Sequence, residues 1–142
     1  MGYDRGSYGF HTRVADYQTG GFDPANSENT LHKDWAILRL AEEAPLEYAA
    51  LSSVNDSYSP DRFFRVVGYA SPRRYALSIS GECIGLQQGS FLLSECPSAE
   101  GMSGAPLIDQ ASGRLVGIQV ARMAQGERVL LVALPAHGLP ER

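Results

Sequence analysis

A serine between glycines is the pattern in this chain with the clearest chemical potential. The stretch reads Gly101-Met102-Ser103-Gly104-Ala105-Pro106. Its glycines allow a tight turn that exposes the Ser103 hydroxyl and directs the backbone N–H groups of Gly101 and Ser103 into one small space. Two such donors beside a hydroxyl would stabilise the oxyanion formed when a serine attacks a carbonyl group. The stretch therefore predicts a nucleophile with an oxyanion hole, and an ordinary glycine turn is the alternative.

An aspartate at the start of an apolar stretch is the second candidate. In residues 33–40, a two-residue period places Asp34 on one face with Ala36, Leu38 and Leu40. Burying an unpaired carboxylate costs several kcal/mol, so we expect Asp34 to have a dedicated hydrogen-bond donor. An aspartate that merely ends a turn before a buried strand is the alternative.

Together these stretches resemble the trypsin-like serine peptidases of the chymotrypsin fold, which carry Gly-x-Ser-Gly-x-Pro and Asp-x-Ala-Leu/Ile-Leu at these points. The strand-like sequence Leu115-Val116-Gly117-Ile118 follows in the family's order. The resemblance covers most of residues 2–134 and is nearest to bacterial members similar to glutamyl endopeptidases. The α/β-hydrolase turn, Gly-x-Ser-x-Gly, fits less well because Ala105 replaces its second glycine and no helical pattern follows.

The resemblance implies a serine-type endopeptidase that cuts peptide bonds through an acyl-enzyme. Ser103 would be the nucleophile, Asp34 would orient the base, and the amides of Gly101 and Ser103 would form the oxyanion hole. Two segments would wall the pocket for the substrate side chain before the cut bond: Ser98, Ala99, Glu100, Val120, Ala121 and Arg122. A peptide or protein substrate is expected, with no metal and no cofactor.

Three positions depart from the family pattern. Met102 replaces the acidic residue that pairs with a new N-terminus in trypsin, so activation by that ion pair is not expected. Pro97 at the pocket floor argues against a strict preference for Lys or Arg. Gln119 stands where the glutamyl branch has a histidine, so a preference for Glu is not implied either.

The family's catalytic histidine, carried in a Thr-Ala-Ala-His-Cys-like stretch before the aspartate, has no counterpart in this sequence. His11 falls within a predicted strand, and His137 is in the tail. His32 would lie about 7 Å from Asp34 along the same strand, so it could not sit between Asp34 and Ser103. We therefore expect the chain to begin inside the first barrel and to be a truncated form with little activity. The alternatives are a catalytically dead homologue that binds peptides or proteins and an unrelated all-β protein.

The composition favours an all-β fold. Fifteen glycines and eight prolines separate short segments rich in Val, Ile, Leu, Phe and Tyr. With the resemblance, this predicts a chymotrypsin-like double antiparallel β-barrel whose first barrel is incomplete. We expect a barrel remnant at 1–42, a linker with at most one helical turn at 43–60, and a C-terminal barrel at 61–142. Exposed strand edges of the incomplete barrel would permit self-association.

Strands are predicted at residues 2–4, 10–17, 62–69, 106–109, 114–120 and 127–134, and a hairpin turns at Gln88-Gly89-Ser90. Cys83 and Cys96 lie at matching distances from this turn, so a cross-strand disulfide is geometrically possible. It would contribute about 3 kcal/mol and would imply a periplasmic or extracellular setting. Two buried thiols in a cytosolic protein are the alternative.

Charge and hydropathy argue against two classes of partner. The net charge is −4 and no basic block is present, so nucleic acid is not expected. The longest apolar run, residues 129–135, is too short to cross a bilayer, and the residues after Met1 do not form a signal peptide. The family resemblance implies a secreted or periplasmic protein.

Overall fold

The computed structural model describes residues 3–4, 6–45, 47–52 and 62–140. The chain divides into two compact units, residues 1–48 and 49–142. This division falls within the segment expected to be a linker, of which residues 46 and 53–60 lie outside the described residues.

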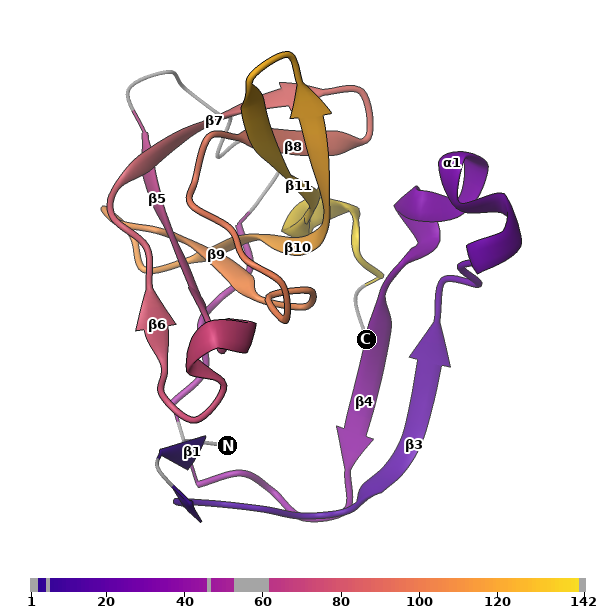
Figure 1. Ribbon diagram of the computed structural model, residues 1–142. Helices are drawn as coiled ribbons and strands as arrows, with labels where there is room; N and C mark the ends of the chain where they lie inside the picture. The colour runs from indigo at the N-terminus through magenta and orange to yellow at the C-terminus, as the bar shows by residue number, and fades with distance from the viewer. Residues whose placement is uncertain (1–2, 5, 46, 53–61, 141–142) are drawn as a thin grey trace. The chain divides into compact units, whose positions relative to one another are not determined.

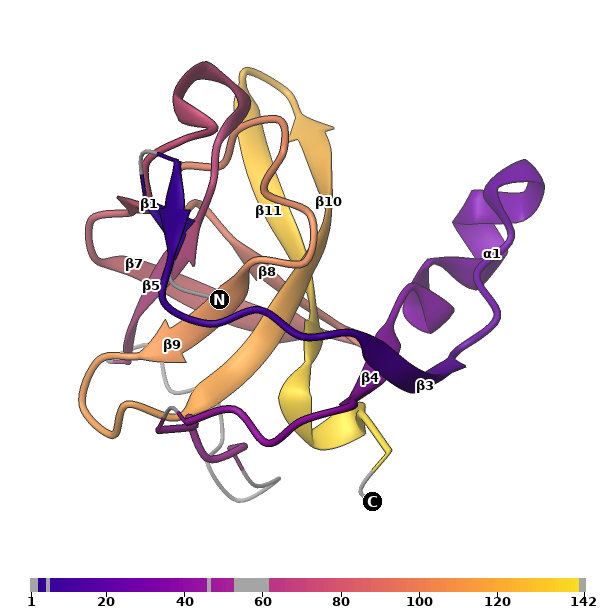
Figure 2. The ribbon, with the colours of Figure 1, turned by 90° about the horizontal axis from the view of Figure 1, so that it is seen from below.

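The larger unit is a closed antiparallel barrel (Figure 1). Its strands follow the order β5-β7-β8-β11-β10-β9, and β9 pairs with β5 to complete the ring. Figure 2 shows the two longest strands, β10 and β11, side by side along the barrel. The bounds are β5 (Phe63–Gly68), β7 (Cys83–Gln88), β8 (Phe91–Ser94), β9 (Pro106–Asp109), β10 (Leu115–Gln125) and β11 (Arg128–Pro135), with a short β6 (Ser78–Ile79) paired to β5.

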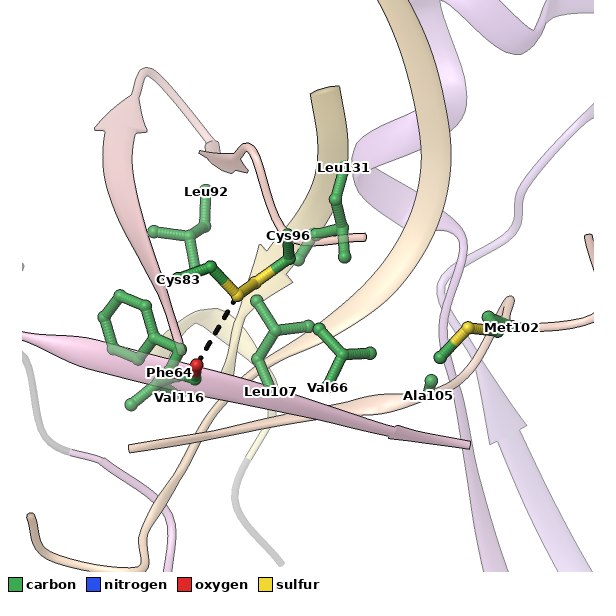
Figure 3. Close-up of a cluster of buried hydrophobic side chains, with 11 residues drawn as sticks. Phe64, Val66, Cys83, Leu92, Cys96, Met102, Ala105, Leu107, Val116 and Leu131 are labelled. Atoms are coloured by element: carbon green, nitrogen blue, oxygen red, sulfur yellow. Dashed lines mark hydrogen bonds between the residues drawn. A yellow bond between two sulfur atoms is a disulfide. The ribbon is translucent and has the colours of Figure 1, made fainter. Parts of the chain in front are cut away.

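Alternating side chains of the strands fill the barrel with an apolar core (Figure 3). In β5, Phe64 and Val66 are fully buried while Phe63 and Arg65 are exposed, which is the two-residue period of a strand with one buried face. The same cluster contains Leu92, Met102, Ala105, Leu107, Val116, Leu131 and Ala133. All buried hydrophobic side chains of the described residues lie between positions 64 and 136.

The predicted disulfide between Cys83 and Cys96 is confirmed. The two Cα atoms are 5.2 Å apart, and the bond closes the β7–β8 hairpin, whose register pairs Gly85 with Ser94. Both cysteines are buried, and Figure 3 shows the bond within the core, with Cys83 Sγ 3.5 Å from the carbonyl oxygen of Phe64. The disulfide therefore fixes the hairpin at the point where the chain turns toward residues 97–103.

The smaller unit contains a two-stranded ribbon in which β3 (Val14–Thr19) pairs with β4 (Ala36–Leu40). Three short helical turns connect them: η1 (Pro24–Asn26), α1 (Ser27–Thr30) and η2 (Leu31–Lys33). A second pair joins β1 (Tyr3–Asp4) to β2 (Ser7–Tyr8). Gly20 ends β3 against Trp35, where a Cβ would lie 2.5 Å from the indole Nε1. None of the helices in the described part of the chain is long and apolar enough to span a membrane.

Several predicted segments differ in detail from the structure. The strand expected at residues 10–17 is displaced to β3, because pairing with β4 runs from Val14 to Thr19. Residues 47–52 contain no helical turn, which agrees with the expectation of at most one, and Leu51 bridges to Leu115. A short 3₁₀ turn, η3 (Ser71–Arg73), with a proline near its start, follows β5. The strands expected after residue 61 are present, with β10 continuing to Gln125.

Candidate active site

Ser103 lies in an exposed turn that leads into β9. Gly101 and Gly104 have φ values of 85° and 83°, a conformation that other residues rarely adopt. Met102 and Ala105 are buried in the barrel core, whereas Ser103 is exposed. The apolar side chains therefore anchor the turn, and the glycines let the backbone place the Ser103 side chain on the outside.

Two N–H groups of this turn have no acceptor among the described residues. They belong to Gly101 and Ser103. The other amides between residues 102 and 105 donate over 2.8 to 3.3 Å: Met102 to Ala99, Gly104 to Gln119 and Ala105 to Met102. Two free donors next to an exposed hydroxyl are the donor set that an oxyanion requires.

The segment after β5 supports the turn from one side. The amide of Ser71 donates to the Glu100 carbonyl over 2.7 Å. A Cβ on Gly101 would lie 3.0 Å from both the Ser71 hydroxyl oxygen and the Tyr69 carbonyl oxygen. Two features thus favour glycine at position 101: its positive φ and the close approach of residues 69–71.

Gln119 of β10 supports the turn from the other side. Its carbonyl accepts from the Gly104 amide over 2.8 Å, and its own amide donates to the Ala105 carbonyl over 2.9 Å. Its side chain is 1% exposed, and Nε2 donates to Ser98 Oγ over 2.5 Å. From the sequence, Gln119 was expected only to mark a departure from the family pattern. A polar residue within the apolar run of residues 115–121 was the available signal for this linking role.

The two segments expected to wall a substrate pocket are in contact. The Ser98–Gln119 hydrogen bond joins them at one end, and Arg122 Nη2 lies 4.0 Å from Glu100 Oε1 at the other. Ser98, Ala99 and Ala121 are half-buried and Val120 is buried, while Glu100 and Arg122 are exposed. Their role in substrate binding remains a prediction.

A groove of about 510 Å³ lies away from these segments. Most of its lining belongs to the β7–β8 hairpin, and none of the predicted site residues is part of it. Its lining consists of Ile84, Gly85, Leu86, Gln88, Leu93, Ser94, Glu95, Gln125 and Leu130.

Asp34 does not lie on the inward face of a strand, contrary to the sequence-based prediction. It is half-buried, it follows η2, and its amide donates to the Leu31 carbonyl over 3.1 Å. In β4, Ala36 and Leu38 are exposed. The reason is that, among the described strands, β4 pairs with β3 alone, and a two-stranded ribbon has no core of its own in which to bury one face.

The expected donor for the Asp34 carboxylate is also not found, since no group in the described part of the chain hydrogen-bonds to it. Asp34 belongs to the smaller unit and Ser103 to the larger one. The pairing of these two residues through a base therefore stays a prediction.

The histidines occupy three separate places. His11 precedes β3 and is exposed, with its ring centroid 4.7 Å from that of Tyr8 in an edge-on arrangement. His32 is exposed in η2, so it does not share a strand with Asp34, and His137 is half-buried in η4 (Ala136–Gly138). Among the residues described, no group of three or more His, Cys, Asp or Glu side chains could hold a metal ion.

Comparison with known proteins relates this arrangement to proteases. A family model described as a trypsin-like peptidase domain matches residues 8–118, which include the Asp34 stretch, the disulfide hairpin and the Ser103 turn. A search of curated proteins gives no match.

Solved structures share the fold at low sequence identity. The scabies mite inactivated protease paralogue S-I1 is 16% identical, with a TM-score of 0.64 over 88% of this chain and 63% of that one. The tobacco vein mottling virus protease is 13% identical, with a TM-score of 0.53 over 73% of this chain and 48% of that one. The chain thus spans only part of the length of each neighbour, and the likeness concerns the all-β, chymotrypsin-like fold.

Proposed function

Because the chain belongs to the family of trypsin-like peptidase domains, we propose that it is a serine endopeptidase domain in which Ser103 is the nucleophile. The observation that carries this proposal is the pair of free amides, on Gly101 and Ser103, beside an exposed hydroxyl. The substrate is a peptide or protein, and the disulfide favours an extracellular or periplasmic setting.

In the proposed reaction, Ser103 Oγ attacks the carbonyl carbon of the peptide bond and gives up its proton to a base. The carbonyl oxygen becomes negative and accepts hydrogen bonds from the amides of Gly101 and Ser103. The C–N bond then breaks, the base returns the proton to the leaving amine, and an ester remains on Ser103. Water attacks this ester with the same base, which releases the carboxylic acid and restores the hydroxyl.

In the described part of the larger unit, no base is hydrogen-bonded to the Ser103 hydroxyl. In the family the base is a histidine oriented by an aspartate, and we assign the orienting role to Asp34. Without a positioned base, an oxyanion hole and substrate binding still leave rates about 10³-fold above uncatalysed hydrolysis. The proposed activity of this chain alone is therefore low.

A catalytically dead peptidase homologue that binds peptides is the second candidate. It is favoured by the absence, among the described residues, of any hydrogen bond to the Asp34 carboxylate. The scabies mite neighbour, described as an inactivated protease paralogue, is consistent with such a use of the fold. In this case the Ser103 turn would bind a peptide without attacking it.

Labelling of Ser103 by a fluorophosphonate probe distinguishes the two functions. The probe reacts with a serine whose proton can be removed and whose oxyanion is stabilised, so free imidazole in solution can supply the missing base. We expect imidazole to accelerate the labelling of Ser103 by at least about tenfold. The modified residue is identified by mass spectrometry of the digested protein.

Ser90 provides the control within the same molecule, because it is exposed and also follows a glycine in a tight turn. Ser90 should stay unlabelled with imidazole, and Ser103→Ala should remove the signal. Equal labelling of Ser90 and Ser103, or none at Ser103 at any imidazole concentration, would contradict the endopeptidase proposal and favour the binding module.

A further inference from the structure

The hydrogen bond between Ser98 and Gln119 leaves one donor and one acceptor of the two side chains without a partner among the described residues. Gln119 Nε2 donates to Ser98 Oγ over 2.5 Å, so the hydroxyl acts as the acceptor. No acceptor for the proton of the Ser98 hydroxyl is present among the described residues. Gln119 Oε1 is buried and has no donor in the same set of residues. The pair therefore lacks one acceptor and one donor.

An unpartnered polar atom on a buried side chain is costly and uncommon, so this one requires an explanation. The backbone of Gln119 is held on both sides by Gly104 and Ala105, which fixes the residue next to the nucleophile turn. Ser98 is half-buried, so its hydroxyl can reach a bound molecule. Gln119 thus connects Ser98, through its side chain, to Gly104, the residue after Ser103, through its backbone. The half-buried Ser98 presents an O–H donor next to this turn.

The charges near the pair favour a neutral ligand group. Arg122 is the cation of the two wall segments, and Glu100 lies 4.0 Å from it. The two charges offset each other, so the walls offer no unpaired cation to a carboxylate. Desolvating an unpaired carboxylate costs far more than desolvating an amide.

From these observations we propose that the Ser98–Gln119 pair selects a carboxamide side chain, that of glutamine or asparagine, in the residue before the cut bond. The carboxamide oxygen supplies the acceptor that the Ser98 hydroxyl lacks, and the carboxamide carries no charge to desolvate. Ser98 contacts the substrate, and Gln119 acts as a positioning residue by turning the hydroxyl toward it. This inference rests on the proposed function, because it assumes that the peptide lies along the Ser103 turn.

The test uses binding rather than cleavage, so that it does not depend on the reactivity of Ser103. Four fluorescent peptides have the same sequence except for the last residue, which is Gln, Glu, Leu or Lys. Their terminal carboxylate can accept hydrogen bonds from the free amides of Gly101 and Ser103. Dissociation constants are measured by fluorescence anisotropy with the 142-residue chain. We expect the Gln peptide to bind about tenfold more tightly than the Leu peptide, which is the value of one added hydrogen bond, and more tightly than the Glu and Lys peptides.

Three variants separate recognition from general loss of structure. Ser98→Ala should bring the Gln and Leu peptides to equal affinity without weakening the Leu peptide. Gln119→Leu has a similar volume and keeps the backbone bonds, and it should also remove the preference because the Ser98 hydroxyl is no longer oriented. Glu100→Gln leaves Arg122 unpaired, so the Glu peptide alone should gain about threefold.

Equal affinity for all four peptides, tightest binding of the Glu peptide, or no measurable binding of any of them would overturn the inference. So would a Gln preference that survives Ser98→Ala. If Gln119→Leu weakened every peptide alike and lowered the urea midpoint, Gln119 would be structural only and the positioning role would be wrong. A Gln preference in a protein whose Ser103 resists the fluorophosphonate would support this inference while contradicting the proposed peptidase reaction.

Discussion

Two glycines beside Ser103 share the same backbone conformation but differ in their surroundings. Gly101 and Gly104 have nearly equal positive φ values. An added Cβ at Gly104 would meet nothing within 4 Å, whereas at Gly101 it would lie 3.0 Å from the Ser71 hydroxyl and the Tyr69 carbonyl. The two positions therefore separate the cost of an unfavourable φ from the cost of a close contact.

We expect Gly104→Ala to lower the free energy of unfolding by about 1 to 2 kcal/mol, through backbone conformation alone. Gly101→Ala should cost at least about 1 kcal/mol more, because the Tyr69 carbonyl is backbone and cannot move aside cheaply. Urea unfolding of the two variants and the parent protein measures this difference. Equal losses in both variants would show that the contact at residues 69–71 does not constrain the turn.

At the level of single residues, the conformation of the serine turn could be predicted from the sequence, whereas the surroundings of Asp34 could not. The Gly-x-Ser-Gly pattern is a local property of the backbone, so an exposed Ser103 between two glycines of positive φ could be predicted from the glycines. The setting of Asp34 depends on whether β4 has a layer to pack against, which alternation alone does not reveal. The role of Gln119 depends on its distance from Ser98, which is set by the barrel and not by nearby sequence.

Among the elements, the β7–β8 hairpin both contributes to the barrel core and positions the segment that leads to the Ser103 turn. Its disulfide lies in the core, and Cys96 begins the segment that continues through Ser98 to Gly101. Ser94 at the end of β8 adds a second restraint, since its hydroxyl donates to the Ile84 carbonyl over 2.6 Å and accepts from the Cys96 amide over 3.1 Å. The start of the Ser98 segment is thus held from both strands of the hairpin.

Reduction of this disulfide should lower the free energy of unfolding by about 3 kcal/mol, as expected for a loop of this length. Urea unfolding with and without a thiol reductant measures the change. A double variant, Cys83→Ala with Cys96→Ala, is the control: it should be less stable than the oxidised parent and indifferent to the reductant. If the parent unfolded at the same urea concentration in both conditions, the disulfide would not contribute to stability.

The elements of the larger unit could be predicted because a closed barrel imposes the two-residue period on each strand. Phe64 and Val66 of β5, for example, alternate with exposed neighbours as their apolar character predicts. The same period predicted a buried face for β4, and there it was wrong because the ribbon of β3 and β4 has no closed sheet around it. The short turns η1, α1 and η2 were not predicted, since polar residues 24–33 carry no hydrophobic period.

For the whole molecule, the distribution of buried side chains separates the two units. Every buried hydrophobic residue in the described part of the chain belongs to the unit of residues 49–142, and β3 is exposed along its full length. Hydrophobic burial is the main source of folding free energy. The stability of the larger unit should therefore depend little on the smaller one.

We accordingly expect a fragment of residues 49–142 to fold cooperatively, with a free energy of unfolding within about 2 kcal/mol of the full chain. A fragment of residues 1–48 should show no cooperative transition, because an isolated ribbon is at best marginally stable in water. Circular dichroism during urea unfolding tests both fragments, and analytical ultracentrifugation shows whether either one associates. Loss of the cooperative transition in 49–142 would mean that the barrel core needs residues 1–48, and the two units would then be one folding unit whose stability the ribbon shares.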